Sequence, residues 1–235
     1  MNATSYLPES TRRLLQALAA FFGFFVCGQF ALLLIAGEDV RTTTVPQQAL
    51  ATAIACFAAV GLALVWPPVH GVRPISGTLR TLLQCVAFFV AWTVVIAFGY
   101  LPLLRAYGVD VPPQPLVAWI AQPRALDATF VGVVLLVCTI GPIAEEIVFR
   151  GYVLGALTLR LGPWVALIAT TLAFGLVHGL LYAVPTALLG LWFGWLAQRS
   201  GGRLWQPILA HVFHNSVVVT MTVAWPDSVT LLHDR

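Results

Sequence analysis

Seven apolar runs, each of helix length, most constrain how this chain can fold. They fall at about 14–37, 49–66, 80–104, 128–159, 163–180, 183–198 and 204–225, the fifth and sixth being short. A helix needs about 20 apolar residues to cross a hydrocarbon core of roughly 30 Å, and only helices or closed barrels satisfy their backbone hydrogen bonds there. The runs are too long for barrel strands. We therefore predict an all-α, polytopic membrane bundle of about seven transmembrane helices.

The composition narrows the class of protein further. Of the 235 residues, 60% are hydrophobic and 9% are charged, and the mean hydropathy is +0.91. Soluble domains are about half apolar and a quarter charged, so a soluble enzyme is excluded. The 12 basic residues are scattered arginines without a basic run, which argues against nucleic-acid binding. We expect one membrane domain over residues 1–235, with the lipid bilayer and no nucleic acid as partner.

The distribution of arginines predicts the orientation. With the N-terminus inside, the inner ends of the runs carry more arginine than the outer ones, as the positive-inside rule requires. We expect a multi-pass protein of the plasma (inner) membrane. The predicted inner arginines are Arg12, Arg13, Arg73, Arg80, Arg160, Arg199 and Arg203, and the outer ones are Arg41, Arg105, Arg124 and Arg235.

Two pairs of glycines have the spacing of a packed helix face. Gly151 and Gly155 form one pair, and Gly190 and Gly194 form the other. Small residues four apart let helices approach closely in lipid. We interpret both pairs as packing devices.

Intramembrane polarity is concentrated in three short segments. These are 145–150 (Glu-Glu-Ile-Val-Phe-Arg), 174–178 (Phe-Gly-Leu-Val-His) and 211–215 (His-Val-Phe-His-Asn). Charged side chains inside a span cost a few kcal/mol each on insertion scales, so they tend to be functional. The three segments are therefore the candidates for a site.

Helix geometry divides the roles within the first segment. Residues four apart share a helix face, so Glu146 and Arg150 are expected to pair and to neutralise each other. Glu145 points about 100° away and has no cation on its own face. A carboxylate in that position suits a general base that takes a proton from water.

The other two segments place imidazole and amide groups at the same spacing. Phe174 can pack against His178, and His211 shares a face with Asn215. Each alone also fits a structural role, as an interior histidine or as hydrogen bonding between helices. At 1.5 Å per residue, Glu145, His178, His211 and Asn215 all lie about 14–24 Å from the inner turns. They can meet only if the fourth helix continues through the glutamates to about Leu159.

Together these groups are equipped to hydrolyse an acyl bond, first of all a peptide bond. A base would activate water, and the remaining donors would stabilise an oxyanion. The chain has no Gly-x-Ser-x-Gly elbow, which argues against a serine mechanism. Two alternatives stay open. Glu145, His178 and His211 could form a two-histidine, one-carboxylate metal site, or the protein could be a non-catalytic immunity factor or scaffold.

The motifs resemble one known family. Glu-Glu-x-x-x-Arg at 145–150, the following Gly151, Phe-x-x-x-His at 174–178 and His-x-x-x-Asn at 211–215 look like the CPBP family of intramembrane glutamic endopeptidases, which includes the CAAX proteases and bacteriocin-processing (Abi) proteins. The resemblance covers roughly 130–219, a CPBP-like catalytic core. The N-terminal helices and loop over 1–127 carry no family motif.

The resemblance implies specific roles and no metal or other cofactor. Glu145 and His178 would activate the attacking water, His211 and Asn215 would form the oxyanion hole, and Glu146, Arg150 and Phe174 would support them. His214 lies outside the family pattern but could face the same cavity as His211. The expected substrate is a membrane-anchored protein or peptide: a CAAX-like C-terminus, a sorting anchor, or a bacteriocin or signal precursor. The predicted orientation places the site nearer the outer leaflet, which favours an exported or membrane-anchored substrate.

Overall fold

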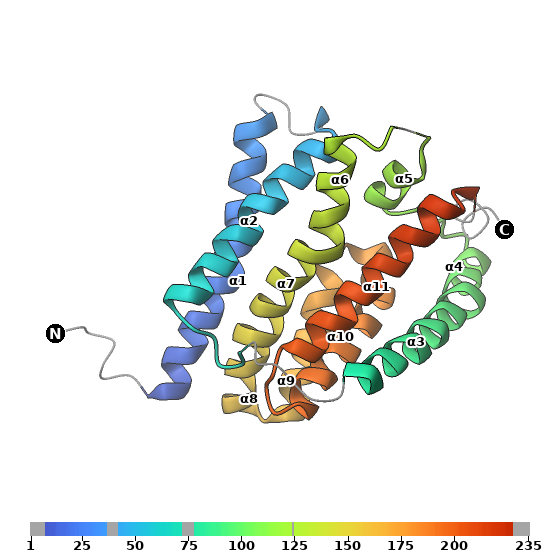
Figure 1. The fold of residues 1–235 in the computed structure, drawn as a ribbon. Helices are drawn as coiled ribbons and strands as arrows, with labels where there is room; N and C mark the ends of the chain where they lie inside the picture. Colours follow the sequence, from blue (N-terminus) through green and yellow to red (C-terminus); the bar gives the residue numbers. More distant parts are fainter. Residues whose placement is uncertain (1–7, 37–41, 72–77, 124, 228–235) are drawn as a thin grey trace.

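The protein is a bundle of helices. A computed structural model describes residues 8–36, 42–71, 78–123 and 125–227, and these contain helices and one isolated β-bridge but no strand. Arg41, Arg73, Arg124 and Arg235, which entered the orientation argument, lie outside the described residues. The all-helical class predicted from the sequence is confirmed (Figure 1).

Six helices of the described residues are long and apolar enough to cross a membrane. They are α1 (Glu9–Ala36), α2 (Val45–Val65), the helix Thr78–Ala106, the helix Ala128–Leu161, the helix Leu180–Arg199 and α11 (Trp205–Ala224). The third comprises α3 (Thr78–Val95), η3 (Ile96–Tyr100) and α4 (Leu101–Ala106), and the fifth comprises η6 (Leu180–Tyr182) and α10 (Ala183–Arg199). The fourth comprises α6 (Ala128–Leu135), η4 (Leu136–Ile140), α7 (Gly141–Glu146), η5 (Ile147–Leu154) and α8 (Gly155–Leu161). Two shorter helices complete the set, α5 (Pro115–Ala121) and α9 (Pro163–Leu176).

The fifth predicted span, 163–180, is wrong at its end. Helix α9 stops at Leu176 after 14 residues, and is too short to be counted with the six. The chain turns at Gly179, whose φ of 94° suits glycine. A Cβ atom on Gly175 would lie 2.5 Å from the carbonyl oxygen of Ala183, so α9 and α10 pack closely at this turn. His178 therefore lies in a turn beyond α9 and not on the helix.

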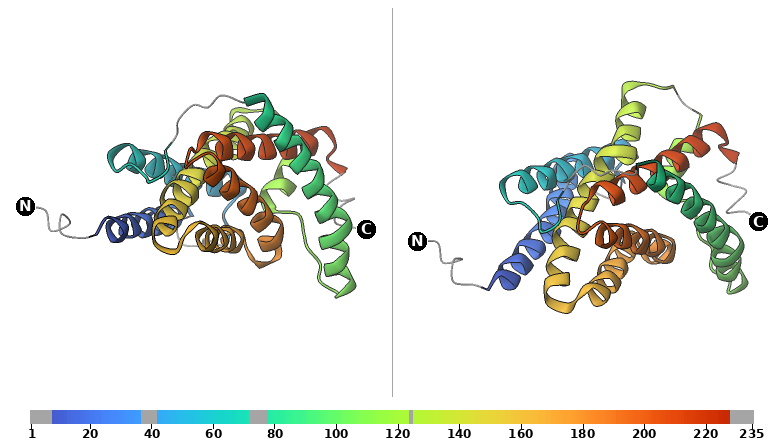
Figure 2. Two further views of the ribbon diagram at one scale, coloured as in Figure 1. Left: turned by 90° about the horizontal axis from the view of Figure 1, so that it is seen from below. Right: turned by 60° about the horizontal axis from the view of Figure 1, so that its bottom comes forward.

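The continuous helix Ala128–Leu161 occupies the centre of the bundle. It continues through both glutamates, which is the condition for the site residues to lie at one depth in the bundle. It contacts α1, α2, α9, α10 and α11 along its length, while α3 packs against the far side of α11. Figures 1 and 2 show this arrangement, with α1 and α2 side by side at one edge and α3 and α4 at the other.

The glycine pairs do pack closely, but against different partners. A Cβ on Gly190 would touch Phe174, and a Cβ on Gly194 would lie 2.6 Å from Leu167, so this pair brings α10 onto α9. Gly151 and Gly155 instead receive Pro68 and Val69, which belong to the segment after α2. That segment is tied to the C-terminal half of the central helix by a hydrogen bond from the N–H of His70 to the carbonyl of Gly151, 3.2 Å long.

Candidate active site

A buried ion pair lies at the base of the site. Arg150 Nη1 lies 2.9 Å from Glu146 Oε1, and both side chains are excluded from solvent, with exposed fractions of 1% and 0%. Arg150 Nη2 donates a second hydrogen bond, 3.0 Å long, to the carbonyl of Gly190, and the guanidinium lies 4.3 Å from the centre of the Phe174 ring. The pairing expected from the four-residue spacing is present, and it joins the central helix to α9 and α10.

The same carboxylate orients His211 on α11. His211 Nδ1 lies 2.9 Å from Glu146 Oε1, and its ring stacks on Phe193 with centroids 4.6 Å apart. A carboxylate can only accept, so Nδ1 donates and Nε2 is left facing the other side of the ring. The contact was not foreseen from the sequence, because Glu146 and His211 are 65 residues apart.

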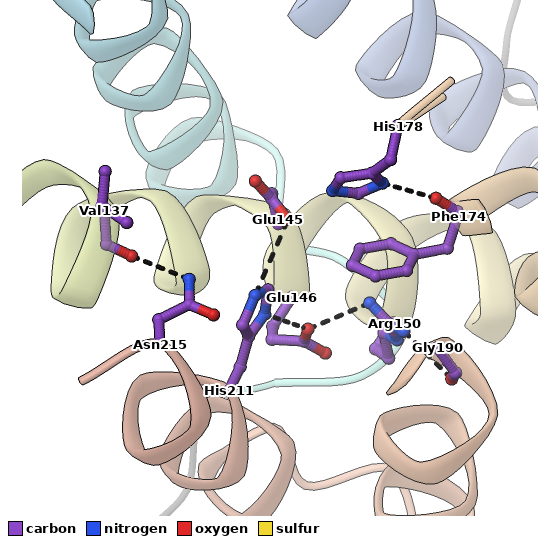
Figure 3. Close-up of polar contacts among 9 residues, drawn as sticks. All are labelled: Val137, Glu145, Glu146, Arg150, Phe174, His178, Gly190, His211 and Asn215. Atoms are coloured by element: carbon purple, nitrogen blue, oxygen red, sulfur yellow. Dashed lines mark hydrogen bonds and ion pairs between the residues drawn. The ribbon is translucent and has the colours of Figure 1, made fainter. Parts of the chain in front are cut away.

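Glu145 lies opposite that free nitrogen. Its Oε2 atom is 3.9 Å from His211 Nε2, too long for a direct hydrogen bond, and has no hydrogen-bond partner among the described residues. The side chain is 24% exposed, unlike that of Glu146. Figure 3 shows the Glu145 carboxylate between the rings of His178 and His211. Glu145 is thus the carboxylate of the pair that a water molecule or a substrate can reach.

His178 is held from its other ring nitrogen. Nδ1 lies 2.6 Å from the carbonyl oxygen of Phe174, and the two rings pack with centroids 4.7 Å apart. A carbonyl accepts, so Nδ1 donates and Nε2 is the nitrogen left for chemistry. In Figure 3 this side of the ring faces Glu145. The turn after α9 therefore presents the imidazole in one tautomer and one orientation.

Asn215 makes a contact that differs from the expected one. Its Nδ2 donates to the carbonyl of Val137, 2.9 Å away. This carbonyl has lost its helical partner, since in the π-helical turn η4 the N–H of Gly141 donates to Leu136 instead, and Pro142 has no N–H. One of the two amide protons of Asn215 is therefore committed to the central helix, and one remains. The sequence signal for this unpaired carbonyl is Pro142, a proline inside an apolar helical run.

Glu145 and His178 line a cavity of about 340 Å³. Its other walls come from α1, α2 and two neighbours of the site: Phe24, Phe25, Gly28, Gln29, Leu32, Gln48, Ala51, Thr52, Ala55, Phe149 and Val177. His211 and Asn215 are not among the lining residues, although His211 Nε2 lies 3.9 Å from Glu145 Oε2. The wall from α1 and α2 was missed, because these helices carry no recognisable motif.

His214 does not join the site. Its ring packs between Trp92 and Phe89 of α3, with centroid distances of 4.8 and 5.3 Å, and 7% of the residue is exposed. His214 is three residues after His211 on α11, and its side chain packs on α3 and not toward Glu145. The possibility that it faces the same cavity as His211 is therefore not realised.

The described residues contain no group of three or more His, Cys, Asp or Glu side chains arranged to hold a metal ion. Glu145, His178 and His211 are therefore not arranged as a set of metal ligands in this structure. The four cysteines, all described, are free thiols.

Fold and site together define a polytopic membrane protein with a carboxylate and two imidazoles gathered inside a helical bundle. Residues 127–217, which include every candidate residue of the site, match the Rce1-like family model, described as type II CAAX prenyl endopeptidase Rce1-like. This part of the chain is similar to membrane endopeptidases of the CAAX type, which agrees with the resemblance that the motifs indicated.

A comparison with curated proteins gives a consistent result. The chain is 37% identical over 83 residues to the protein named "Putative membrane peptidase YdiL" of Bacillus subtilis (strain 168). The aligned region is 35% of this chain, and the chain covers about a third of that relative's length, 34%. No solved structure gives a significant match.

Proposed function

We propose that the protein is an intramembrane endopeptidase that hydrolyses a peptide bond of a membrane-anchored protein or peptide in the plasma membrane. One observation carries the proposal. The only carboxylate oxygen of the described site that is both unpartnered and next to a cavity is that of Glu145, and His178 lines the same cavity. The match of residues 127–217 to the model of a protease family supports this proposal.

In the proposed reaction, Glu145 takes a proton from a water molecule placed between it and His178. The water oxygen attacks the carbonyl carbon of the scissile bond, and the carbonyl electron pair moves to its oxygen. His178 Nε2 orients the water, because Nδ1 is already bound to Phe174. Glu145 then returns the proton to the leaving nitrogen as the carbon–nitrogen bond breaks. The products are a carboxylic acid, which keeps the second proton of the water, and an amine.

The oxyanion needs donors, and α11 supplies two candidates. His211 can donate from Nε2 when its ring carries both protons, since Nδ1 already donates to Glu146. Asn215 keeps one amide proton after its bond to Val137. Donors fixed in advance stabilise developing charge without reorganisation, which commonly contributes the largest share of catalysis. The Glu146–Arg150 pair holds these donors in place and is not proposed to react.

Two observations bear on the class of substrate. The family description names CAAX prenyl endopeptidases, whereas the predicted orientation favours an exported or membrane-anchored protein, such as one with a C-terminal sorting anchor. Reporter fusions at Gly201-Gly202 test the orientation. A cytoplasmic position for this turn supports an outward-facing site, and an external position contradicts it.

The decisive experiment is membrane proteomics of host cells that carry either the native chain or Glu145→Gln. We expect one precursor to keep its anchor or signal segment only with the variant, because an amide cannot accept the proton of water. Glu9→Gln is the matched control, since Glu9 is exposed and pairs with Arg12 and Arg13 at the start of α1. Identical proteomes for the native chain and Glu145→Gln would contradict proteolysis and favour a scaffold.

A further inference from the structure

Two helices outside the family motifs form the wall opposite the catalytic pair. On α1 the lining positions 24, 25, 28, 29 and 32 recur at helical spacing, and on α2 so do 48, 51, 52 and 55. Each set therefore occupies one face of its helix. The two faces meet in a groove that is continuous with Glu145 and His178, which line the same cavity. In Figure 3 the ring of His178 points toward the Glu145 carboxylate, on the side of the site where the ribbons of α1 and α2 are drawn.

Gln29 is a polar residue in the apolar stretch 17–36 of α1. Gln29 lies within α1, 20 residues after Glu9, and its side chain lines the cavity. An amide placed at membrane depth is costly unless it finds a partner. Gln48 and Thr52 on α2 already bond locally, Gln48 to Thr43 and Thr52 to the carbonyl of Gln48. Gln29 makes no hydrogen bond of this kind within the described chain.

The side chains that line the groove favour one kind of ligand, an extended peptide. An amide side chain offers one acceptor and two donor protons, the complement of a peptide main chain. An extended peptide needs such partners, because its N–H and C=O groups have left their helical bonds. Apart from Glu145 and His178, the lining carries no ionisable side chain, so it offers nothing to neutralise a charged residue. The small residues Gly28, Ala51 and Ala55 leave space in the groove. Most of the other lining side chains are aromatic or aliphatic.

We propose that the groove between α1 and α2 binds the substrate as an extended, uncharged and largely apolar peptide segment, and that Gln29 pairs with its main chain next to the scissile bond. The inference rests on the proposed endopeptidase function and assigns substrate recognition to the part of the chain before residue 127. It makes Gln29 a positioning residue. The bond to be cut then reaches Glu145 and His178 with its carbonyl exposed.

Photocrosslinking in the inactive background tests the position of the substrate. In cells carrying Glu145→Gln, the photoreactive residue p-benzoylphenylalanine replaces either Gln29 or the adjacent Phe30. Phe30 is the matched control, because it is the next residue of α1, points about 100° away from Gln29 and does not line the cavity. We expect the accumulated precursor to crosslink from position 29 and not from position 30.

The outcomes separate the two proposals. Accumulation of a precursor that crosslinks from position 30, or from neither position, overturns the groove and leaves the protease function standing. Absence of any precursor in the Glu145→Gln cells contradicts the protease function, and the groove as a substrate site with it.

A second measurement follows the rate of processing. Gln29→Leu keeps the size of the side chain and removes its donors and acceptor, so we expect processing of the precursor to slow by about tenfold, the effect of one lost hydrogen bond to a buried partner. Gln29→Asn should restore part of the rate, and Phe30→Leu should leave it unchanged. Native-rate processing by a folded Gln29→Leu chain overturns the role of Gln29.

The charge preference is tested on the substrate itself. An aspartate placed in the precursor segment that crosslinks to position 29 should slow its cleavage by at least about tenfold, because the groove cannot pair it. An asparagine at the same place should be tolerated better. Equal cleavage of the two precursors overturns the requirement for an uncharged segment.

Discussion

His211 is held by Glu146 across the interior of the bundle, with Nδ1 lying 2.9 Å from Oε1. The same carboxylate oxygen accepts from Arg150 at 2.9 Å. One buried carboxylate therefore joins a cation on its own helix to an imidazole on α11. It fixes which nitrogen of His211 faces Glu145. Glu146 therefore orients an imidazole next to the proposed general base, Glu145.

The energetics of this buried pair can be tested by removing one charge or both. Arg150→Met leaves Glu146 as an uncompensated buried charge and should cost about 3–5 kcal/mol of stability. Glu146→Gln together with Arg150→Met removes both charges and should recover most of that loss, while activity stays low because His211 has lost its charged partner. Thermal unfolding in detergent, followed by tryptophan fluorescence, measures both effects. Arg12→Met is the control, since its ion pair with Glu9 is exposed and should contribute little. Equal destabilisation by the single and double variants contradicts the argument.

The contact between Asn215 and Val137 allows its structural and catalytic roles to be separated. Asn215→Ala leaves a carbonyl of the central helix without a donor and should cost about 1–3 kcal/mol. Pro142→Ala supplies an N–H close to that carbonyl and should restore part of the stability in the double variant. If Asn215 also serves the oxyanion, activity stays low after stability returns. Recovery of both together would show that its role is structural only.

The two histidines of α11 should respond differently to the same substitution. His214→Phe should keep activity and stability, because the ring packs between Trp92 and Phe89 and its Nδ1 has no hydrogen-bond partner among the described residues. His211→Phe should abolish processing of the precursor, because it removes the nitrogen that faces Glu145. Processing assays and thermal unfolding of both variants check this contrast. Loss of activity in a stable His214→Phe chain would assign that histidine a role that the geometry does not provide.

A pH effect is expected from His70, which lies between α2 and α3 and outside the spans. Burial lowers the pKa of His70 below its ordinary value of 6.5, and a contact with the backbone of Arg150 offsets part of this shift. The unfolded chain then binds a proton more readily than the folded one, so stability is complete above about pH 6.5 and declines as the pH falls toward the folded pKa. His70→Gln should flatten this part of the unfolding profile between about pH 7 and 5. A variant with an unchanged profile contradicts the assignment.

Periodicity and spacing were enough to predict much of the bundle. Apolar runs of helix length indicated the spans, because lipid offers the backbone no other hydrogen-bond partners. The four-residue spacing indicated the pairing of Glu146 with Arg150, since both lie on one face of one helix. The end of α9 at Leu176 could not be derived in this way, because it depends on how closely Gly175 approaches α10.

The features that follow from the order of the residues are local: which segments enter the membrane, and which polar residues share a helix face. Which helices contact one another depends on how the bundle packs in three dimensions. This packing brought Glu146 to His211 and Asn215 to the carbonyl freed by a π-helical turn, and it placed α1 and α2 over Glu145. These contacts join segments far apart in the chain, and they depend on side-chain packing between helices, for which helical periodicity carries no information.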